Sequence, residues 1–210
     1  NTLASFQKAL DLGVQAIELD VHVAACGALV VFHDFTVDRM TNGSGEVHKL
    51  TLEQLKNLTV AGEFQIPTLA ETFDLISRKC WINVELKGHG TAEQVCQLIE
   101  EYVTTKGWQY DDFVVSSFQK DELDKTRAHN TEIRLATLSQ ASVEQALEWA
   151  DALSAYAIHP HFSLLTDDNI HEAKKKGYKI NVWTVNHHED IQRLEAHIID
   201  GIISDFPDRL

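Results

Sequence analysis

The sequence predicts an α/β fold of the (β/α)8 TIM-barrel type, and three observations support this. Short runs of β-branched and apolar residues alternate with stretches of helical periodicity from end to end, as in a parallel sheet wrapped by helices. No predicted strand is followed by a glycine-rich nucleotide-binding fingerprint, so nothing indicates an open, doubly wound sheet. The number of strands is close to the eight of a closed barrel.

Several runs have the composition of strands. They span residues 14–21, 28–33, 81–87, 112–117, 132–138, 152–158, 179–185 and 201–204. We interpret 28–33 as an extension beside the strand before it, which leaves seven strands for the barrel. Because the chain opens with a helix pattern, one strand before Asn1 would complete the eight. We therefore expect a barrel whose first strand is missing from this chain.

Helical patterns fill most of the intervals between these strands. Near the beginning, apolar residues recur on one helix face between residues 3 and 10, with Thr2 as the expected N-cap and Gly13 as the stop. Similar patterns cover residues 68–78, 92–104, 120–129, 143–149, 167–176 and 188–197. Gly107 and Gly177 lie where helix C-termini are expected.

Residues 34–67 break the alternation of strand and helix. Turn-forming Asp, Asn, Gly and Ser residues there surround a single short helical stretch at 51–58. An excursion of this length between a strand and a helix indicates an insertion, and in a barrel it would lie at the catalytic rim. We predict a single barrel domain over residues 1–210, with a small cap insertion at 34–67 after the second strand.

Charge and composition exclude some classes of partner. A net charge of −14 disfavours nucleic acid, because phosphate backbones attract basic surfaces. It does not disfavour a phosphate-containing small molecule, since a bound divalent cation reverses the local field. No apolar run approaches the ~20 residues of a transmembrane segment. The three cysteines lack the spacing of a disulfide framework or a zinc site, so we expect a reducing, cytoplasmic location. The oligomeric state is not predicted.

Two predicted strands carry charged side chains that face one side. In the segment IELD, Glu18 and Asp20 are two residues apart and point together, and in INVELK the same holds for Glu85 and Lys87. We expect both pairs at the carboxyl ends of their strands, where barrel enzymes place catalytic groups. Buried carboxylates that lie together need a cation or a proton. The three carboxylates predict a site for Ca²⁺ or Mg²⁺, and Lys87 a phosphate contact. Salt-bridged rim residues are the alternative.

Histidines supply candidates for proton transfer. His33 follows a predicted strand directly, where an imidazole is suited to general acid–base work near neutral pH. A buried, hydrogen-bonded histidine is the alternative for such a position. His22 would share the inward face of its strand with the carboxylates, and we interpret it as a polar group behind the ligands. We expect the other histidines, His159 and His161 among them, at the surface.

Later strand ends add polar and aromatic candidates. Ser116 and Ser117 end one strand, and Trp183 lies near the end of another. Hydroxyl groups there would bind phosphate or substrate hydroxyls, and an indole ring would form an apolar wall for a glycerol backbone. We predict Ser117 and Trp183 as substrate contacts, with plain core packing as the alternative for Trp183.

Taken together, these segments resemble the glycerophosphodiester phosphodiesterase family. The segments that carry the resemblance are NTLASFQKALDLGVQAIELDV at 1–21, VVFHD at 30–34, TVDRMTNGSGEV at 36–47, IPTLAE at 66–71, NVELK at 83–87, VWTVN at 182–186 and DGIISDFP at 200–207. They occur in order along essentially the whole chain. No single segment is specific, but the combination is.

The resemblance implies a (β/α)8 barrel with an inserted cap that hydrolyses glycerophosphodiesters to sn-glycerol 3-phosphate and an alcohol, with one Ca²⁺ or Mg²⁺. The residues that match the family's metal ligands are Glu18, Asp20 and Glu85. His33 matches one of two catalytic histidines, and Lys87 and Trp183 match phosphate and glycerol contacts.

One departure from the family pattern leaves alternatives open. The family's first catalytic histidine and its neighbouring arginine lie in an H-R-G motif upstream of Asn1, and we expect that segment to precede this chain. A lysophospholipase D-type enzyme is a second interpretation. Its apolar mouth would be formed by Leu50, Leu52, Leu55, Leu58 and Phe64 of the insertion, for which a packed mini-core is the alternative. A barrel that binds a phosphodiester without hydrolysing it is a third, if the upstream histidine is absent. The leaving alcohol, the identity of the metal and the nucleophile, water or the glycerol 2-hydroxyl, stay open.

Overall fold

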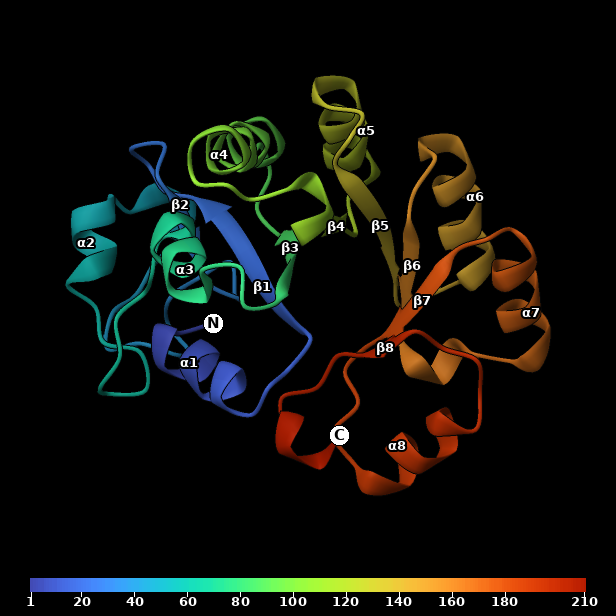
Figure 1. Cartoon of the computed structure of the whole chain (residues 1–210). Coiled ribbons are helices and arrows are strands. Elements are labelled where there is room, and N and C mark those ends of the chain that lie inside the picture. Colours follow the sequence, from blue (N-terminus) through green and yellow to red (C-terminus); the bar gives the residue numbers. More distant parts are fainter.

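The computed structural model describes all 210 residues, and its centre is one curled β-sheet with helices along the outer side (Figure 1). The strands lie in the order β2-β1-β3-β4-β5-β6-β7-β8. Their bounds are β1 Ala16–Val23, β2 Leu29–Val31, β3 Trp81–Leu86, β4 Phe113–Ser117, β5 Arg134–Ser139, β6 Ala157–Pro160, β7 Lys179–Val182 and β8 Gly201–Ile202. All neighbouring strands are parallel except β1 and β2, which form an antiparallel hairpin.

Helices follow most strands and cover the convex side of the sheet (Figure 1). Their bounds are α1 Leu3–Asp11, α2 Leu52–Lys56, α3 Leu69–Ile76, α4 Ala92–Thr105, α5 Lys120–His129, α6 Val143–Leu153, α7 Asp167–Lys175 and α8 His188–Glu195. Short 3₁₀ turns are η1 Val47–Lys49, η2 Tyr110–Asp112, η3 Phe162–Leu164 and η4 Pro207–Arg209. The expected cap Thr2 accepts the backbone N–H of Ser5. None of the helices combines the length and the hydrophobicity needed to span a membrane.

The hairpin confirms that the run at 28–33 is an extension beside its neighbour and not a further parallel strand. Val21, His22 and Val23 pair with β2 in antiparallel register. No ladder joins β8 to β1, so the curled sheet stays open between these two strands (Figure 1). This is the place at which we expect one further strand, and that strand stays a prediction.

Most strands differ from their predicted bounds by a few residues, and two of the differences bear on the site. The predicted strand at 152–158 is wrong over residues 152–156, because α6 continues to Leu153 and the chain then turns at Ser154, whose φ is 48°, before β6 begins at Ala157. β1 runs on to Val23 because its last residues pair with the hairpin partner. Glu18 and Asp20 therefore lie within β1, although Asp20 is still in the next-to-last pair of the β1–β3 ladder.

The main core lies between the sheet and the helices on its convex side. It holds 24 buried residues from α1, α3, α4 and the outward face of β1, β3 and β4, among others. It includes an aromatic group: the ring of Phe73 lies 5.2 Å from that of Tyr102, 5.8 Å from Trp108 and 5.1 Å from Phe113, centre to centre. The concave side has only a small apolar group of Val114, Ala136 and Ala157, which leaves it to polar side chains.

The segment at 34–67 has a separate small core shared with the β1–β2 hairpin. Its buried members are Ala24, Val30, Phe32, Val37, Val47, Leu55, Val60 and Ile66. The apolar side chains that pack against them include Leu50, Leu52, Leu58 and Phe64. The leucines named above as a possible apolar mouth are therefore packed against one another.

The aromatic group should carry much of the stability of this fold. We expect Phe73→Ala to lower the free energy of unfolding by about 3–5 kcal/mol, because it removes a fully buried ring and leaves a cavity. Urea denaturation measures this. Phe35→Ala is the control, since Phe35 exposes 52% of its surface and should change stability by less than about 1 kcal/mol. Equal losses in the two variants would contradict this account of the core.

Candidate active site

Three carboxylates meet on the concave side of β1 and β3. Asp20 and Glu85 are paired in the parallel ladder, and Glu18 is two residues before Asp20 on the same face. One carboxylate oxygen from each lies within 4.8 Å of the others. Asp20 is 3% and Glu85 7% exposed. The strand register therefore holds three acidic groups together in a place with little water.

The electrostatics of this cluster show that its negative charge is not satisfied by the protein. Burial raises the pKa of Glu18 well above its ordinary value, and repulsion from Asp20 and Glu85 adds to this. Burial and the charge of Asp20 raise the pKa of Glu85 to about 7. The Glu85 Oε1 atom lies 3.0 Å from Lys87 Nζ but makes no hydrogen bond of good angle. Such a group has the properties of a cation site.

Lys87 is the cation that the chain itself supplies. Its Nζ lies 3.2 Å from Asp20 Oδ1, 3.0 Å from Glu85 Oε1 and 3.4 Å from His33 Nε2. Burial opposes its charge, but the two carboxylates outweigh this and raise the pKa of Lys87. Lys87 stays charged at neutral pH, and one ammonium faces three carboxylates.

His33 is held by a chain of charged hydrogen bonds. Its Nδ1 lies 2.7 Å from Asp34 Oδ1, and Arg39 donates to both oxygens of Asp34 at 2.7 and 2.8 Å. The bond from Arg39 is the main reason that the pKa of Asp34 falls to about 2, so Asp34 is ionised. With Nδ1 bound to Asp34, Nε2 is the imidazole atom that faces Lys87. This is the arrangement of an oriented acid–base histidine.

Two further side chains lie behind the cluster. His22 is buried, as expected from its strand phase, and burial is the main cause that lowers its pKa to about 4. Its ring meets Phe35 edge to face, with 5.3 Å between centroids. The Asn1 amide donates to Asp20 Oδ2 at 2.8 Å and accepts the Asp20 N–H at 3.1 Å. Spacing alone did not indicate Asn1, because 19 residues separate it from its partner.

Ser117 is the last residue of β4, and Trp183 directly follows β7, farther along the sheet. The Trp183 indole donates to the His159 carbonyl at 2.7 Å, and its ring meets Phe118 edge to face at 5.4 Å. Ser117 is fully buried, and its hydroxyl donates to the Leu86 carbonyl at 2.8 Å and accepts from the Gln119 N–H at 3.0 Å. A direct substrate contact by either residue stays a prediction.

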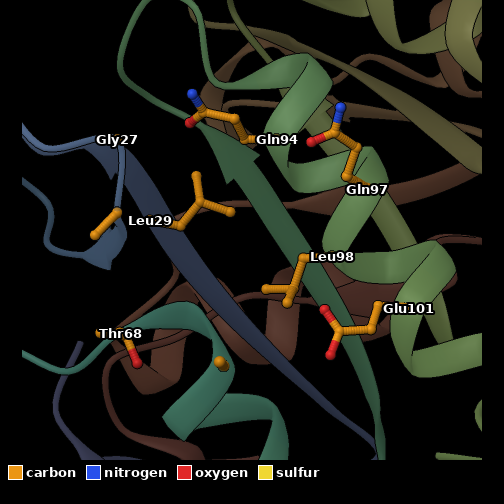
Figure 2. Close-up of a pocket in the computed structure, with 9 residues that line it drawn as sticks. Gly27, Leu29, Thr68, Gln94, Gln97, Leu98 and Glu101 are labelled. Atoms are coloured by element: carbon orange, nitrogen blue, oxygen red, sulfur yellow. The ribbon is translucent and has the colours of Figure 1, made fainter. Parts of the chain in front are cut away.

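Two cavities help to place the site. A cavity of about 140 Å³ adjoins the cluster and is lined by Phe35, Glu85, Leu86, Lys87, Phe118 and Gln119. A second, of about 420 Å³, lies on the outer side between the hairpin and α4, where Gln94, Gln97 and Leu98 line it (Figure 2). Glu85 and Lys87 line the first cavity and none of Glu18, Asp20 and Glu85 lines the second, so the first is the candidate active-site cavity.

The expectation that His159 lies at the surface is wrong. It is fully buried on the concave side, where its Nε2 accepts from the Asn181 amide at 3.0 Å and its Nδ1 has no partner. Burial lowers its pKa to about 3, so it is neutral. The predicted strand ended at residue 158 and left His159 outside it, whereas β6 runs from Ala157 to Pro160 and pairs His159 with Leu138 of β5.

Comparison with known proteins identifies the family. The model of the glycerophosphoryl diester phosphodiesterase family matches residues 1–209. The chain belongs to this family. It is 35% identical to a glycerophosphodiester phosphodiesterase of Caldanaerobacter subterraneus subsp. tengcongensis, over 100% of this chain and 90% of that protein. The predicted enzyme class, a phosphoric diester hydrolase, is thereby confirmed.

Solved structures of family members have the same fold. A phosphodiesterase of Oleispira antarctica, in complex with the product sn-glycerol-3-phosphate, superposes with a TM-score of 0.90 at 30% identity, over 100% of this chain and 88% of that one. A putative glycerophosphodiester phosphodiesterase of Galdieria sulphuraria gives a TM-score of 0.89 at 27% identity, over 99% and 88% of the chains. The predicted α/β barrel architecture is confirmed.

The buried His159 predicts a pH dependence of stability. Its pKa in the folded protein is about 3, below the ordinary value of 6.5. Between these two pH values His159 is protonated in the unfolded chain but neutral in the folded protein. The stability that neutral His159 contributes is complete above pH 6.5 and is lost as the pH falls towards 3, by about 1.4 kcal/mol per pH unit.

His159→Gln tests this, because glutamine keeps an acceptor for Asn181 and does not titrate. Urea denaturation between pH 7 and pH 4 should show a smaller loss of stability in the variant than in the parent chain. His171→Gln is the control, since His171 is exposed on α7. Parallel profiles for the parent and His159→Gln would contradict the assignment.

Proposed function

We propose that this chain hydrolyses glycerophosphodiesters to sn-glycerol 3-phosphate and an alcohol, with one divalent cation held by Glu18, Asp20 and Glu85. The observation that carries the proposal is the meeting of these carboxylates within 4.8 Å against the single ammonium group of Lys87. The family match and the product-bound relative support the substrate class. An all-oxygen ligand set is typical of Ca²⁺ or Mg²⁺.

The residues around the cation site divide the chemical work. A bound cation would stabilise negative charge on the phosphate in the transition state. Lys87 binds a phosphate oxygen from the side of His33. His33 exchanges a proton through Nε2, since Asp34 and Arg39 hold its Nδ1. Trp183 forms an apolar wall for the glycerol backbone.

Two alternatives have less support. A lysophospholipid substrate needs room for an acyl chain, but the cap leucines are packed and the cavity at the cluster holds about 140 Å³. That space suits a short head group. A barrel that only binds a phosphodiester does not explain why Arg39 and Asp34 orient His33 so closely. Assays against glycerophosphocholine and lysophosphatidylcholine separate the three readings.

Glu85→Gln tests the cation site. We expect kcat/KM for glycerophosphocholine to fall by more than about 100-fold, because the loss of a ligand should exceed the 10–100-fold cost of losing a group behind one. Calorimetry should show weaker Ca²⁺ binding in the same variant. Asp168→Asn, on the exposed side of α7, is the matched control and should behave like the parent chain. Full activity of Glu85→Gln under saturating Ca²⁺ would sink the assignment.

Asp34→Asn tests the orientation of His33. The amide keeps the size of the side chain but loses the paired charge of Arg39 and favours the wrong imidazole tautomer. We expect kcat to fall about 10–100-fold with little change in KM. Arg39→Lys should give a smaller loss, because a lysine keeps the charge but not the two-pronged geometry. Unchanged kcat in Asp34→Asn would show that His33 needs no such partner.

A further inference from the structure

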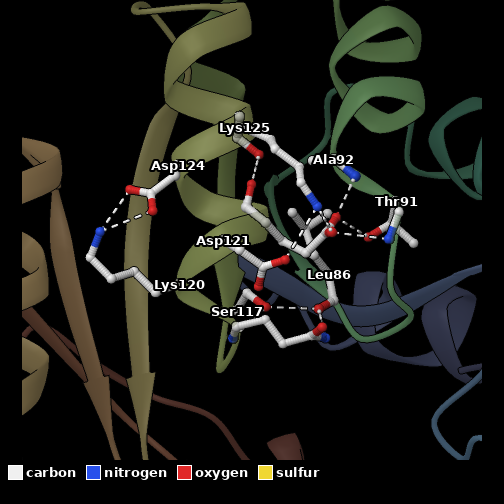
Figure 3. A network of polar contacts seen from close by, with 12 residues as sticks. Leu86, Thr91, Ala92, Ser117, Lys120, Asp121, Asp124 and Lys125 are labelled. Carbon is white, nitrogen blue, oxygen red and sulfur yellow. Dashed lines mark hydrogen bonds and ion pairs between the residues drawn. The ribbon is translucent and has the colours of Figure 1, made fainter.

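The loop after β3, residues 87–91, begins at Lys87 and is held by the neighbouring βα unit. At its start, the Leu86 carbonyl accepts from the Ser117 hydroxyl at 2.8 Å (Figure 3). The Lys87 carbonyl accepts from the Gln119 side-chain amide at 2.9 Å. These bonds fix the backbone on both sides of the Lys87 Cα atom.

Glu122 of α5 holds the other end of this loop. Its side chain is fully buried, and its oxygens accept the N–H groups of Gly90 and Ala92, each at 2.9 Å. Lys125 donates to it at 2.7 Å (Figure 3). Burial alone would raise the pKa of Glu122, but the bonds from Lys125, Gly90 and Ala92 lower it. A buried carboxylate that is ionised and fully bonded is costly to disturb.

Glu122 also replaces the local cap of α4. The N-cap residue Thr91 caps no helix N–H with its own side chain. Its hydroxyl instead donates to the Gly88 carbonyl at 2.9 Å. A carboxylate from the next unit therefore caps this helix, which suits the partial positive charge at a helix N-terminus. The Thr91 hydroxyl is thereby left to bond within the loop, to the Gly88 carbonyl.

The loop has little room to move against β1. The N–H groups of Lys87 and Gly88 both donate to the Val21 carbonyl, at 3.2 and 3.0 Å. A Cβ atom on Gly88 would lie 2.9 Å from His22 Nδ1 and 3.2 Å from His22 Cα. The first part of the loop is thus tied to β1 and its end is tied to Glu122, so only the short segment between these two attachments separates Lys87 from the contacts of Glu122.

We propose that Glu122 is a positioning residue of the active site: it fixes the loop that sets Lys87 Nζ between Asp20, Glu85 and His33, and so tunes the binding of the phosphate group. The proposal rests on the function proposed above, in which Lys87 binds a phosphate oxygen. Glu122 itself touches neither the carboxylate cluster nor the cavity beside it.

The same helix offers a matched control at its other end. Arg127 of α5 donates to the carbonyls of Thr131 and Ile133, before β5, and of Leu153 and Ser154, before β6. It thus holds loops at the amino ends of the strands, away from the rim that carries Lys87. Arg127→Met should destabilise the fold without moving the phosphate site.

The experiment is a double-mutant cycle read by calorimetry with sn-glycerol 3-phosphate in saturating Ca²⁺. Glu122→Gln should weaken binding of this product about 10-fold in the parent chain, and less than twofold in a Lys87→Met background. KM for glycerophosphocholine should rise in parallel while kcat changes less.

Arg127→Met should lower Tm by at least as much as Glu122→Gln but change the product Kd less than twofold. Thr91→Val, which is close to isosteric, should weaken binding about threefold and serves if Glu122→Gln does not fold.

The outcomes separate this proposal from the function beneath it. Weakened binding in Lys87→Met together with parent-like binding in Glu122→Gln and Thr91→Val would overturn the positioning role alone. The positioning role would also be overturned if Glu122→Gln weakened product binding equally in the parent chain and in the Lys87→Met background, because the effect would then not depend on Lys87. Parent-like binding in Lys87→Met would contradict the phosphate assignment of the proposed function, and the positioning role with it.

Discussion

The mutual repulsion of Glu18, Asp20 and Glu85 is the interaction on which the rest of the site depends. The parallel register places Asp20 opposite Glu85, and the two-residue period of β1 brings Glu18 to the same side. The backbone ladder therefore enforces the repulsion, and no small side-chain movement relieves it. Lys87 offsets one of three charges. A fold that maintains such a cluster in a buried place gains stability from any cation that binds there.

The β1–β2 hairpin brings the acid–base group to this cluster. β1 extends past its ladder with β3, and the chain turns back over Val21–Val23 in antiparallel register. The Phe32 N–H then donates to the Asp20 carbonyl at 3.0 Å, so the next residue, His33, comes out beside the acidic site. The small core under residues 34–67 fixes this return, because Val30 and Phe32 are part of it. The packing of residues 34–67 therefore also determines where the imidazole of His33 lies.

The sequence predicted most of the strands and helices and the charged residues of the site that lie on β1, on β3 and directly after β3. Strand phase alone predicted that Glu18 and Asp20 share a face, and likewise Glu85 and Lys87, because alternation within a strand is a local property. The register that places Asp20 opposite Glu85 is seen only in the structure. Asn1 and Glu122 could not be found from strand phase, since their partners are 19 and 30–32 residues distant. His159 was misplaced for a related reason. It lies within β6, but the predicted strand was set too early and stopped at residue 158, because the local pattern did not mark the end of α6 at Leu153.

The two ends of α5 show how one helix serves stability and function separately. Arg127 satisfies four carbonyls at the amino side of the sheet, and Glu122 satisfies two N–H groups at the carboxyl side. Between them, Leu123 is fully buried in the main core. The position of α5 is therefore set by the packing of Leu123 together with the polar contacts of Glu122 and Arg127, and the helix in turn holds the loop that begins at Lys87. A side chain at the rim then has a defined position because a core far from it is well packed.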